Sequence, residues 1–109
     1  MVDKILTGAG FVLNKTYKET RFLSPPKDTS YAVYSKTIES RGSDFKNEIK
    51  DIDISIELYE YSPDPEAEAR IEAQLNSYGI EYTKQSRYWI SAEQLYQVIY
   101  DFSYVTKGG

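Results

Sequence analysis

The C-terminal part of the chain alternates between large apolar side chains and mixed positions. Read at a period of two, one face carries Tyr96, Val98, Tyr100, Phe102 and Tyr104. The other face mixes polar side chains with apolar ones. Aromatic and β-branched residues in such an alternation are typical of a strand that buries one face. The pattern therefore predicts a central or near-central strand over residues 95–105, with the rest of the chain packed against it.

The beginning of this segment also fits a helix. Its apolar residues show the helical spacing i, i+3, i+4, i+7 at Ala92, Leu95, Tyr96 and Ile99. Ser91, with Gln94 three residues later, resembles a capping box. Beyond Tyr100, however, the alternation continues and good helix formers are absent. We therefore expect a short turn over residues 91–94 that leads directly into the strand.

A β-hairpin is predicted in the middle of the chain. Its second strand has the clearest alternation, with Ile49 as an early extension and one apolar face formed by Ile52, Ile54, Ile56 and Leu58. Its first strand runs from Tyr31 to about Ile38. Because Tyr31–Tyr34 is apolar on both faces, we expect that part to be covered on both sides. The polar segment Glu39–Lys46 joins the two strands as a loop hinged at Gly42.

A helix is predicted after the hairpin. Asp64 is a good N-cap, Pro65 suits the first helical position, and Glu66 and Glu68 complement the helix dipole. The helix runs to about residue 78, with a buried stripe formed by Ala67, Ile71, Leu75 and Tyr78. Glu68 lies off this stripe. Gly79 follows as the C′ residue.

The remaining segments are shorter. Residues 1–7 predict a helix whose apolar stripe is Val2, Ile5 and Leu6. Phe11–Leu13 is expected to open a strand, and residues 16–23 form an edge strand or an extended arm. Pro25 and Pro26 then break the chain, because proline donates no backbone hydrogen bond.

Between the second helix and the last strand, two apolar pieces leave an alternative open. Ile80–Tyr82 and Tyr88–Ile90 are either one interrupted strand or two separate ones. Residues 106–109 are expected to form a flexible tail.

The order of elements is α-β-β-β-α-β-β. One amphipathic helix and several antiparallel strands predict an α+β fold, a two-layer sandwich with a mostly antiparallel sheet. A length of 109 residues fits a single domain, 1–109, with the short N-terminal helix inside residues 1–10.

The composition removes several classes of function. Histidine and cysteine are both absent, so the usual general base, the thiolate nucleophile and zinc or iron–sulfur ligands are missing. The carboxylate pairs Asp51/Asp53 and Asp64/Glu66 are best explained as a solvated strand face and as helix capping. We therefore expect no catalytic residues, no cofactor and no metal.

Charge and hydropathy narrow the partners. The net charge is −4 and the basic residues are scattered, so direct nucleic-acid binding is not expected. No run of eighteen apolar residues occurs, so no membrane span is expected either. The absence of cysteine fits folding in the cytosol. The eleven tyrosines suit a core and surfaces that become buried on assembly.

One succession of motifs carries a family resemblance. It consists of Pro25-Pro26, Tyr31–Tyr34, Ile56–Tyr59, Asp64–Glu66 with Ile71-Glu72, Gly79–Tyr82, Tyr88–Ile90 and Leu95–Phe102. Over about Thr20 to Val105, the chain resembles small prophage proteins of Gram-positive bacteria. They are similar to the tail-completion proteins of long-tailed phages, also called tail terminator or head–tail joining proteins.

This resemblance implies a function in assembly. Tail terminators have a sheet flanked by helices, and they form a hexameric ring that caps the tail tube and faces the head connector. The expected partners are thus other copies of the chain, tail-tube proteins and head-connector proteins. The expected location is the virion, and the host cytoplasm during assembly. Two alternatives stay open: another morphogenesis factor, such as a head-completion protein, or a small regulatory or ligand-binding domain.

A closed ring needs two different contact patches on each subunit. We expect one patch in the loop over residues 39–46, at Arg41, Asp44, Phe45 and Lys46; an ordinary flexible hairpin loop is the alternative. Pro25 and Pro26 are a second candidate contact. Trp89 is expected in the core, but would be a candidate contact if exposed beside Tyr88.

Overall fold

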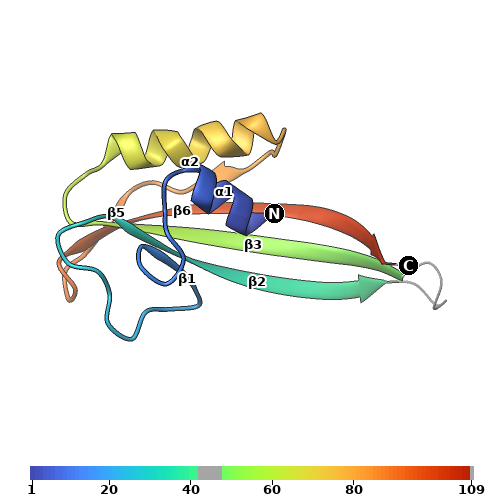
Figure 1. The fold of residues 1–109 in the computed structure, drawn as a ribbon, viewed down its shortest axis with the longest axis horizontal. Helices are drawn as coiled ribbons and strands as arrows, with labels where there is room; N and C mark the ends of the chain where they lie inside the picture. The colour runs from blue at the N-terminus through green and yellow to red at the C-terminus, as the bar shows by residue number, and fades with distance from the viewer. Residues whose placement is uncertain (42–47, 109) are drawn as a thin grey trace.

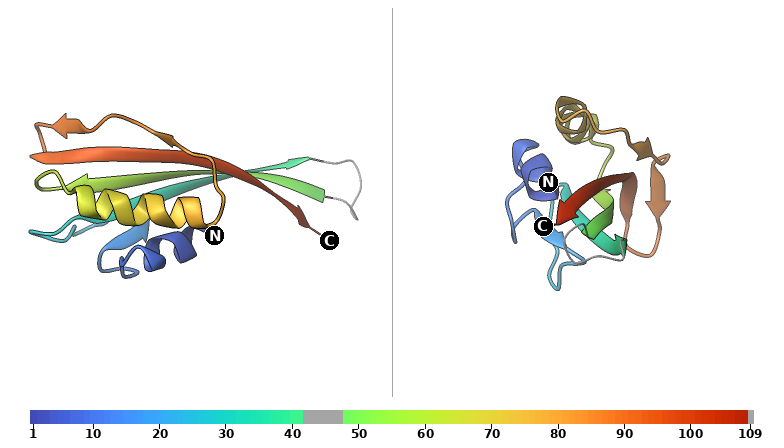
Figure 2. Two further views of the ribbon diagram at one scale, coloured as in Figure 1. Left: turned by 90° about the horizontal axis from the view of Figure 1, so that it is seen from above. Right: turned by 90° about the vertical axis from the view of Figure 1, so that its right-hand side faces the viewer.

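The structure, a computed structural model, describes residues 1–41 and 48–108. In this part of the chain, two helices pack on one face of a six-stranded sheet (Figures 1 and 2). In chain order the elements are α1 (Val2–Gly8), β1 (Tyr17–Glu19), β2 (Tyr31–Arg41), β3 (Glu48–Glu60), α2 (Pro65–Ser77), β4 (Thr83–Lys84), β5 (Tyr88–Ile90) and β6 (Leu95–Gly108). The predicted α+β class and the order of the main elements are confirmed.

The sheet is mostly antiparallel, as predicted. Its strand order is β1-β2-β3-β6-β4, and β5 also pairs with β6. β2 and β3 form the predicted hairpin, and β6 pairs with β3 along nearly its whole length. Only the short β1 is parallel to its neighbour, β2, within the described residues. β6 thus has the near-central place that its alternation predicted.

The core lies between this sheet and the two helices. The alternating residues of β3 and β6 face the helices, and Ile56, Leu58 and Val98 are completely buried. On the helices, the fully buried side chains are Ile5, Leu6, Ala67, Ile71 and Leu75. Each large aliphatic side chain buried in this way contributes roughly 1.5–3 kcal/mol relative to an exposed one.

The start of the chain departs from the prediction. Phe11 is buried, but Val12 and Leu13 are half exposed, and no strand begins there. Instead the chain turns tightly: the Thr16 hydroxyl accepts a hydrogen bond from the Val12 amide, and Asn14 has a φ of 64°. The turn delays the edge strand until Tyr17 and shortens it to three residues.

Helix α2 begins as predicted, but the residue predicted to be buried at its end is exposed. The Asp64 side chain accepts from the Ala67 amide, and Pro65 opens the helix. Tyr78 caps the C-terminus and is 44% exposed, so the prediction that it is buried is wrong. Gly79, at φ +67°, turns the chain away from the helix axis, which explains this exposure. Glu68, in the first turn, is buried although the sequence placed it off the buried stripe.

The segment between α2 and β6 resolves the open alternative. Ile80–Tyr82 is not a strand, and the two short strands β4 and β5 are separate pieces at the edge of β6. The predicted turn over residues 91–94 is present. β6 then continues to Gly108, three residues beyond the end that the alternation indicated.

Three strands extend beyond the helices. In Figures 1 and 2, β2, β3 and β6 continue past the end of α2 as a narrow sheet. Residues 39–41, which were predicted as loop, belong to β2. Ile38 and Val105 lie on this projecting part and are more than half exposed. None of the helices in the described ranges is long and apolar enough to cross a membrane.

Candidate functional site

The predicted contact residue Arg41 lies at the far end of the projecting strands. Its guanidinium makes a two-pronged ion pair with Asp51 of β3, with Nη2 3.0 Å from Oδ1. Arg41 is therefore paired within its own subunit, and the strand pairing orients it. The other three residues of this predicted patch, Asp44, Phe45 and Lys46, lie outside the described residues.

The second predicted patch is at the opposite end of β2. Pro26 follows the β1 region, and its carbonyl oxygen accepts a hydrogen bond from the Tyr61 hydroxyl. Pro25 lines a groove of about 500 Å³ beside it. Because Pro25 and Pro26 precede Tyr31 and Arg41 ends the strand, the fold keeps Arg41 apart from these two prolines.

The groove beside Pro25 is lined by aromatic rings. Tyr31 stacks on Tyr59 with ring centroids 5.2 Å apart, and Phe22 meets Tyr31 edge-on at 5.6 Å. Burial, followed by the charge of neighbouring groups, raises the pKa of Tyr31 to about 12, so its hydroxyl stays neutral at physiological pH. The groove thus offers flat apolar walls with phenolic hydroxyls.

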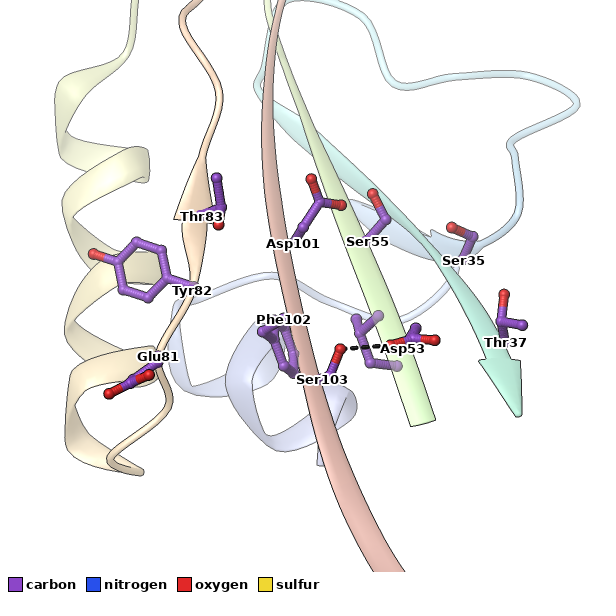
Figure 3. A pocket seen from close by; sticks show the side chains of 11 residues that line it. Ser35, Thr37, Asp53, Ser55, Glu81, Tyr82, Thr83, Asp101, Phe102 and Ser103 are labelled. Carbon is purple, nitrogen blue, oxygen red and sulfur yellow. Dashed lines mark hydrogen bonds between the residues drawn. The ribbon is translucent and has the colours of Figure 1, made fainter. Parts of the chain in front are cut away.

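A second hollow, of about 530 Å³, has a polar lining (Figure 3). Serine, threonine and aspartate side chains from β2, β3 and β6 gather there, and the Ser103 hydroxyl donates to Asp53. The Gln85 amide group donates to Asp101 at 2.9 Å. Because its charged groups are carboxylates, this surface would repel the phosphates of a nucleic acid.

The strand edges of the projecting part are open. β1 pairs with β2 only over Ala32–Tyr34, so within the described residues Ser35–Arg41 has no strand on that side. β4 and β5 pair with β6 only between Leu95 and Asp101, so Phe102–Gly108 has a similar open edge within the same ranges. Unpaired backbone amides and carbonyls at such edges can accept another strand.

A buried ionic cluster lies between α2 and the sheet. Glu60 on β3 is completely buried, and Glu68 on α2 is 5% exposed. The two carboxyl groups are hydrogen-bonded to each other. Arg87 bridges them: its Nε is 3.1 Å from Glu60 Oε1, and its Nη2 contacts Glu68. Lys84 Nζ lies 2.9 Å from Glu68 Oε1.

A further carboxylate extends this cluster to β6. Lys84 Nζ is 2.8 Å from Glu72 Oε2, and the Tyr100 hydroxyl donates to the same oxygen at 2.7 Å. Burial, followed by the hydrogen bond to Glu72, raises the pKa of Tyr100. The cluster therefore links α2, β3, β4 and β6.

The pKa values of the two buried carboxyls shift in opposite directions. Burial, followed by the hydrogen bond with Glu68, raises the pKa of Glu60 to about 7. Burial pushes the pKa of Glu68 upwards as well, but its hydrogen bonds with Glu60, Arg87 and Lys84 outweigh burial and lower it to about 2. Of the two, Glu60 is therefore the carboxyl that binds a proton first as the pH falls. A completely buried Glu60 offers no access to a substrate, so the pair is suited to holding elements together.

Sequence reasoning missed this cluster, although one signal was present. Glu60 continues the alternation of Ile56 and Leu58, and so falls on the buried face of β3. Lys84 and Arg87 carried no such signal, because β4 is only two residues long and Arg87 lies between β4 and β5. Trp89, expected in the core, is 43% exposed and rests on Tyr96 with ring centroids 4.7 Å apart.

Comparison with known proteins gives a structural match. No family model and no curated protein matches the sequence. The fold is similar to that of a chain in the virion of a native gene transfer agent (GTA) particle. The TM-score is 0.61 at 11% sequence identity, and the match covers 95% of this chain and 84% of that chain. At this identity the likeness shows a shared fold.

Proposed function

We propose that this protein is a structural component of a phage-like virion and acts in its assembly. The observation that carries the proposal is the fold likeness to a GTA virion chain, which spans 95% of the present chain. The resemblance to prophage tail-completion proteins supports the same class of function. The protein then acts by binding other virion proteins and not by catalysis. Its location is the virion, after assembly in the host cytoplasm.

More narrowly, we propose tail completion at the head–tail junction. In this function the chain forms a ring, a hexamer by the family resemblance, on the end of the tail tube. Tail-tube and head-connector proteins contact its two faces. Arg41 is a candidate contact at the end of β2, and Pro25 and Pro26 are candidates near its other end. Asp44, Phe45 and Lys46, which lie outside the described residues, are further candidates. The separation of Arg41 from the two prolines along β2 suits contacts with two different partners.

The open strand edges supply the two unlike patches that a ring needs. The edge of β2 over Ser35–Arg41 and the edge of β6 over Phe102–Gly108 lie on opposite sides of the projecting sheet. Each is seven residues long. Pairing of the first edge with the second edge of a neighbouring copy is head-to-tail, and repeated rotation closes such a contact into a ring.

Proline substitutions test this contact with little effect on the fold. Tyr34 accepts a backbone bond from Thr20 of the β1 side, so even-numbered residues of β2 direct their amides towards the open edge. Lys36→Pro therefore removes an outward amide only. On β6, the Ile99 carbonyl accepts a bond from the Gln85 amide, so odd-numbered residues direct their amides towards the open edge. Val105→Pro therefore removes an outward amide of β6. Edge strands tolerate proline at such positions.

We expect the wild-type chain to give cyclic oligomers at high concentration in native mass spectrometry and rings in electron microscopy. Each proline variant should stay monomeric, while Lys36→Ala and Val105→Ala behave as wild type. A mixture of the two proline variants has one intact contact and should give heterodimers without rings. Rings formed by either proline variant would refute the edge contact. A wild-type chain that stays monomeric even with purified tail tubes would refute tail completion.

The aromatic groove favours a second candidate function, a small ligand-binding domain. Its volume of about 500 Å³ and its Tyr31 and Tyr59 walls suit a flat apolar ligand. This alternative predicts a stable monomer or dimer at every concentration. Saturable binding of an aromatic probe, lost in Tyr59→Ala, would favour it.

A further inference from the structure

Residues 81–90 cross the edge of the sheet outside β6 as an extended strap (Figure 2). Two residues of this strap pair with β6 in β4, and three pair with it in β5. The Gln85 amide adds one bond, to the Ile99 carbonyl at 2.9 Å. Backbone pairing with the sheet is therefore short and interrupted.

The strap also buries little apolar surface. Tyr82 and Ile90 are partly buried, and the other eight residues of the strap are exposed. Tyr82 meets Tyr100 with ring centroids 5.8 Å apart, and Trp89 rests on Tyr96. A segment with few buried contacts and exposed backbone belongs to the low-stability end of a protein.

The charged side chains in the middle of the strap connect it to α2 and β3. Lys84 and Arg87, three positions apart, each contact two carboxylates of the cluster described above. Glu60 and Glu68 are buried in the closed strap, while both cations stay about one third exposed. Opening the strap would move the two cations away and leave these carboxyl groups without positive partners. The ionic contacts therefore favour the closed state.

We propose that the strap is a cover that opens separately from the rest of the fold, latched by Lys84 and Arg87. Opening uncovers the edge of β6 from Leu95 to Asp101, which then joins the open edge from Phe102 to Gly108. The longer edge lies beside three carboxylates. The segment that fits it is therefore an extended strand with two cations three residues apart. This inference does not depend on the proposed ring, because the two edges that the ring uses, Ser35–Arg41 and Phe102–Gly108, are not covered by the strap.

Hydrogen exchange followed by mass spectrometry tests the latch. In the double variant Lys84→Gln/Arg87→Gln, the peptide covering residues 81–90 should exchange about tenfold faster or more, while peptides from β3 keep their rates. The matched control, Arg21→Gln/Lys27→Gln, removes the same charge from exposed residues elsewhere and should leave the strap unchanged. Unchanged exchange in the strap, or equal acceleration of strap and β3, would overturn the proposal.

The wild-type chain supplies a second measurement in case the double variant fails to fold. Because both cations are partly exposed, salt screens their contacts. Raising sodium chloride from about 0.05 M to about 1 M should speed exchange in the strap and leave β3 unaffected. Identical exchange rates of strap and β3 at both salt concentrations would show that the strap opens only with global unfolding, which also overturns the proposal.

Discussion

At the scale of single residues, Glu60 makes an unusual contribution to stability. An ordinary glutamate has a pKa of 4.5, whereas burial raises that of Glu60 to about 7 in the folded protein. The folded state then holds this proton more tightly than the unfolded state, so its contribution to stability falls as the pH rises from about 4.5 to about 7. The lowered pKa of Glu68 has the opposite effect. Its contribution to stability is present above about pH 4.5 and is lost as the pH falls from about 4.5 to about 2.

This pair predicts a specific pH dependence. In urea unfolding, the wild-type chain should lose stability between pH 5 and pH 8 through Glu60. Glu60→Gln keeps the shape and a donor towards Glu68 but cannot lose a proton, so its profile should be flatter. Glu19→Gln, at an exposed position, is the matched control and should follow wild type. If the stability of Glu60→Gln falls with pH as steeply as that of wild type, Glu60 does not titrate in this range.

At the scale of elements, the start of α2 depends on Asp64. Its Oδ1 accepts from the Ala67 amide at 3.1 Å, and its Oδ2 accepts from the Ser30 hydroxyl at 2.7 Å. The same residue therefore caps the helix and fixes the loop that precedes β2. The local signal for the cap was in the sequence, but the bond to Ser30, 34 positions away, was not.

Asp64→Ala should lower the free energy of unfolding by about 1 kcal/mol or somewhat more, because it removes a helix cap together with a side-chain bond. Ser30→Ala isolates the second contribution, since it leaves the cap intact. Urea denaturation of both variants measures the difference. If Ser30→Ala costs as much as Asp64→Ala, the cap contributes nothing measurable.

At the scale of the whole molecule, stability is unevenly distributed along the sheet. Beneath the helices Ile56 is completely buried, whereas Ile38 on the projecting strands is 52% exposed. The half of the sheet that carries the open edges therefore has little core of its own. Such a region is suited to binding another subunit, because the neighbouring subunit then buries its exposed apolar side chains.

Two matched truncations test this division. Ile56→Ala should cost about 2–5 kcal/mol of folding free energy, because it leaves a cavity in the core. Ile38→Ala should cost less than about 1 kcal/mol, because the side chain is largely in water already. Thermal or urea unfolding of the isolated chain measures both. Equal losses of folding free energy would mean that Ile38 is packed as well as Ile56 in the core.

The sequence by itself determined the elements whose signals are local. Alternation over Ile52–Leu58 and over Val98–Phe102 established the two longest strands, and Asp64 with Pro65 established where α2 begins. These patterns are reliable because the burial of every second residue, or a cap at a fixed offset, depends only on near neighbours. The α+β class and the hairpin followed from the order of these signals.

Only the tertiary structure decided what distant residues do together. It brought Arg87 and Lys84 from the strap onto Glu60 and Glu68, and it paired Arg41 with Asp51. It also decided which parts of β2 and β6 lack a neighbouring strand among the described residues. No spacing in the chain encodes these contacts, because they depend on how far each strand extends beyond the helices that cover the sheet.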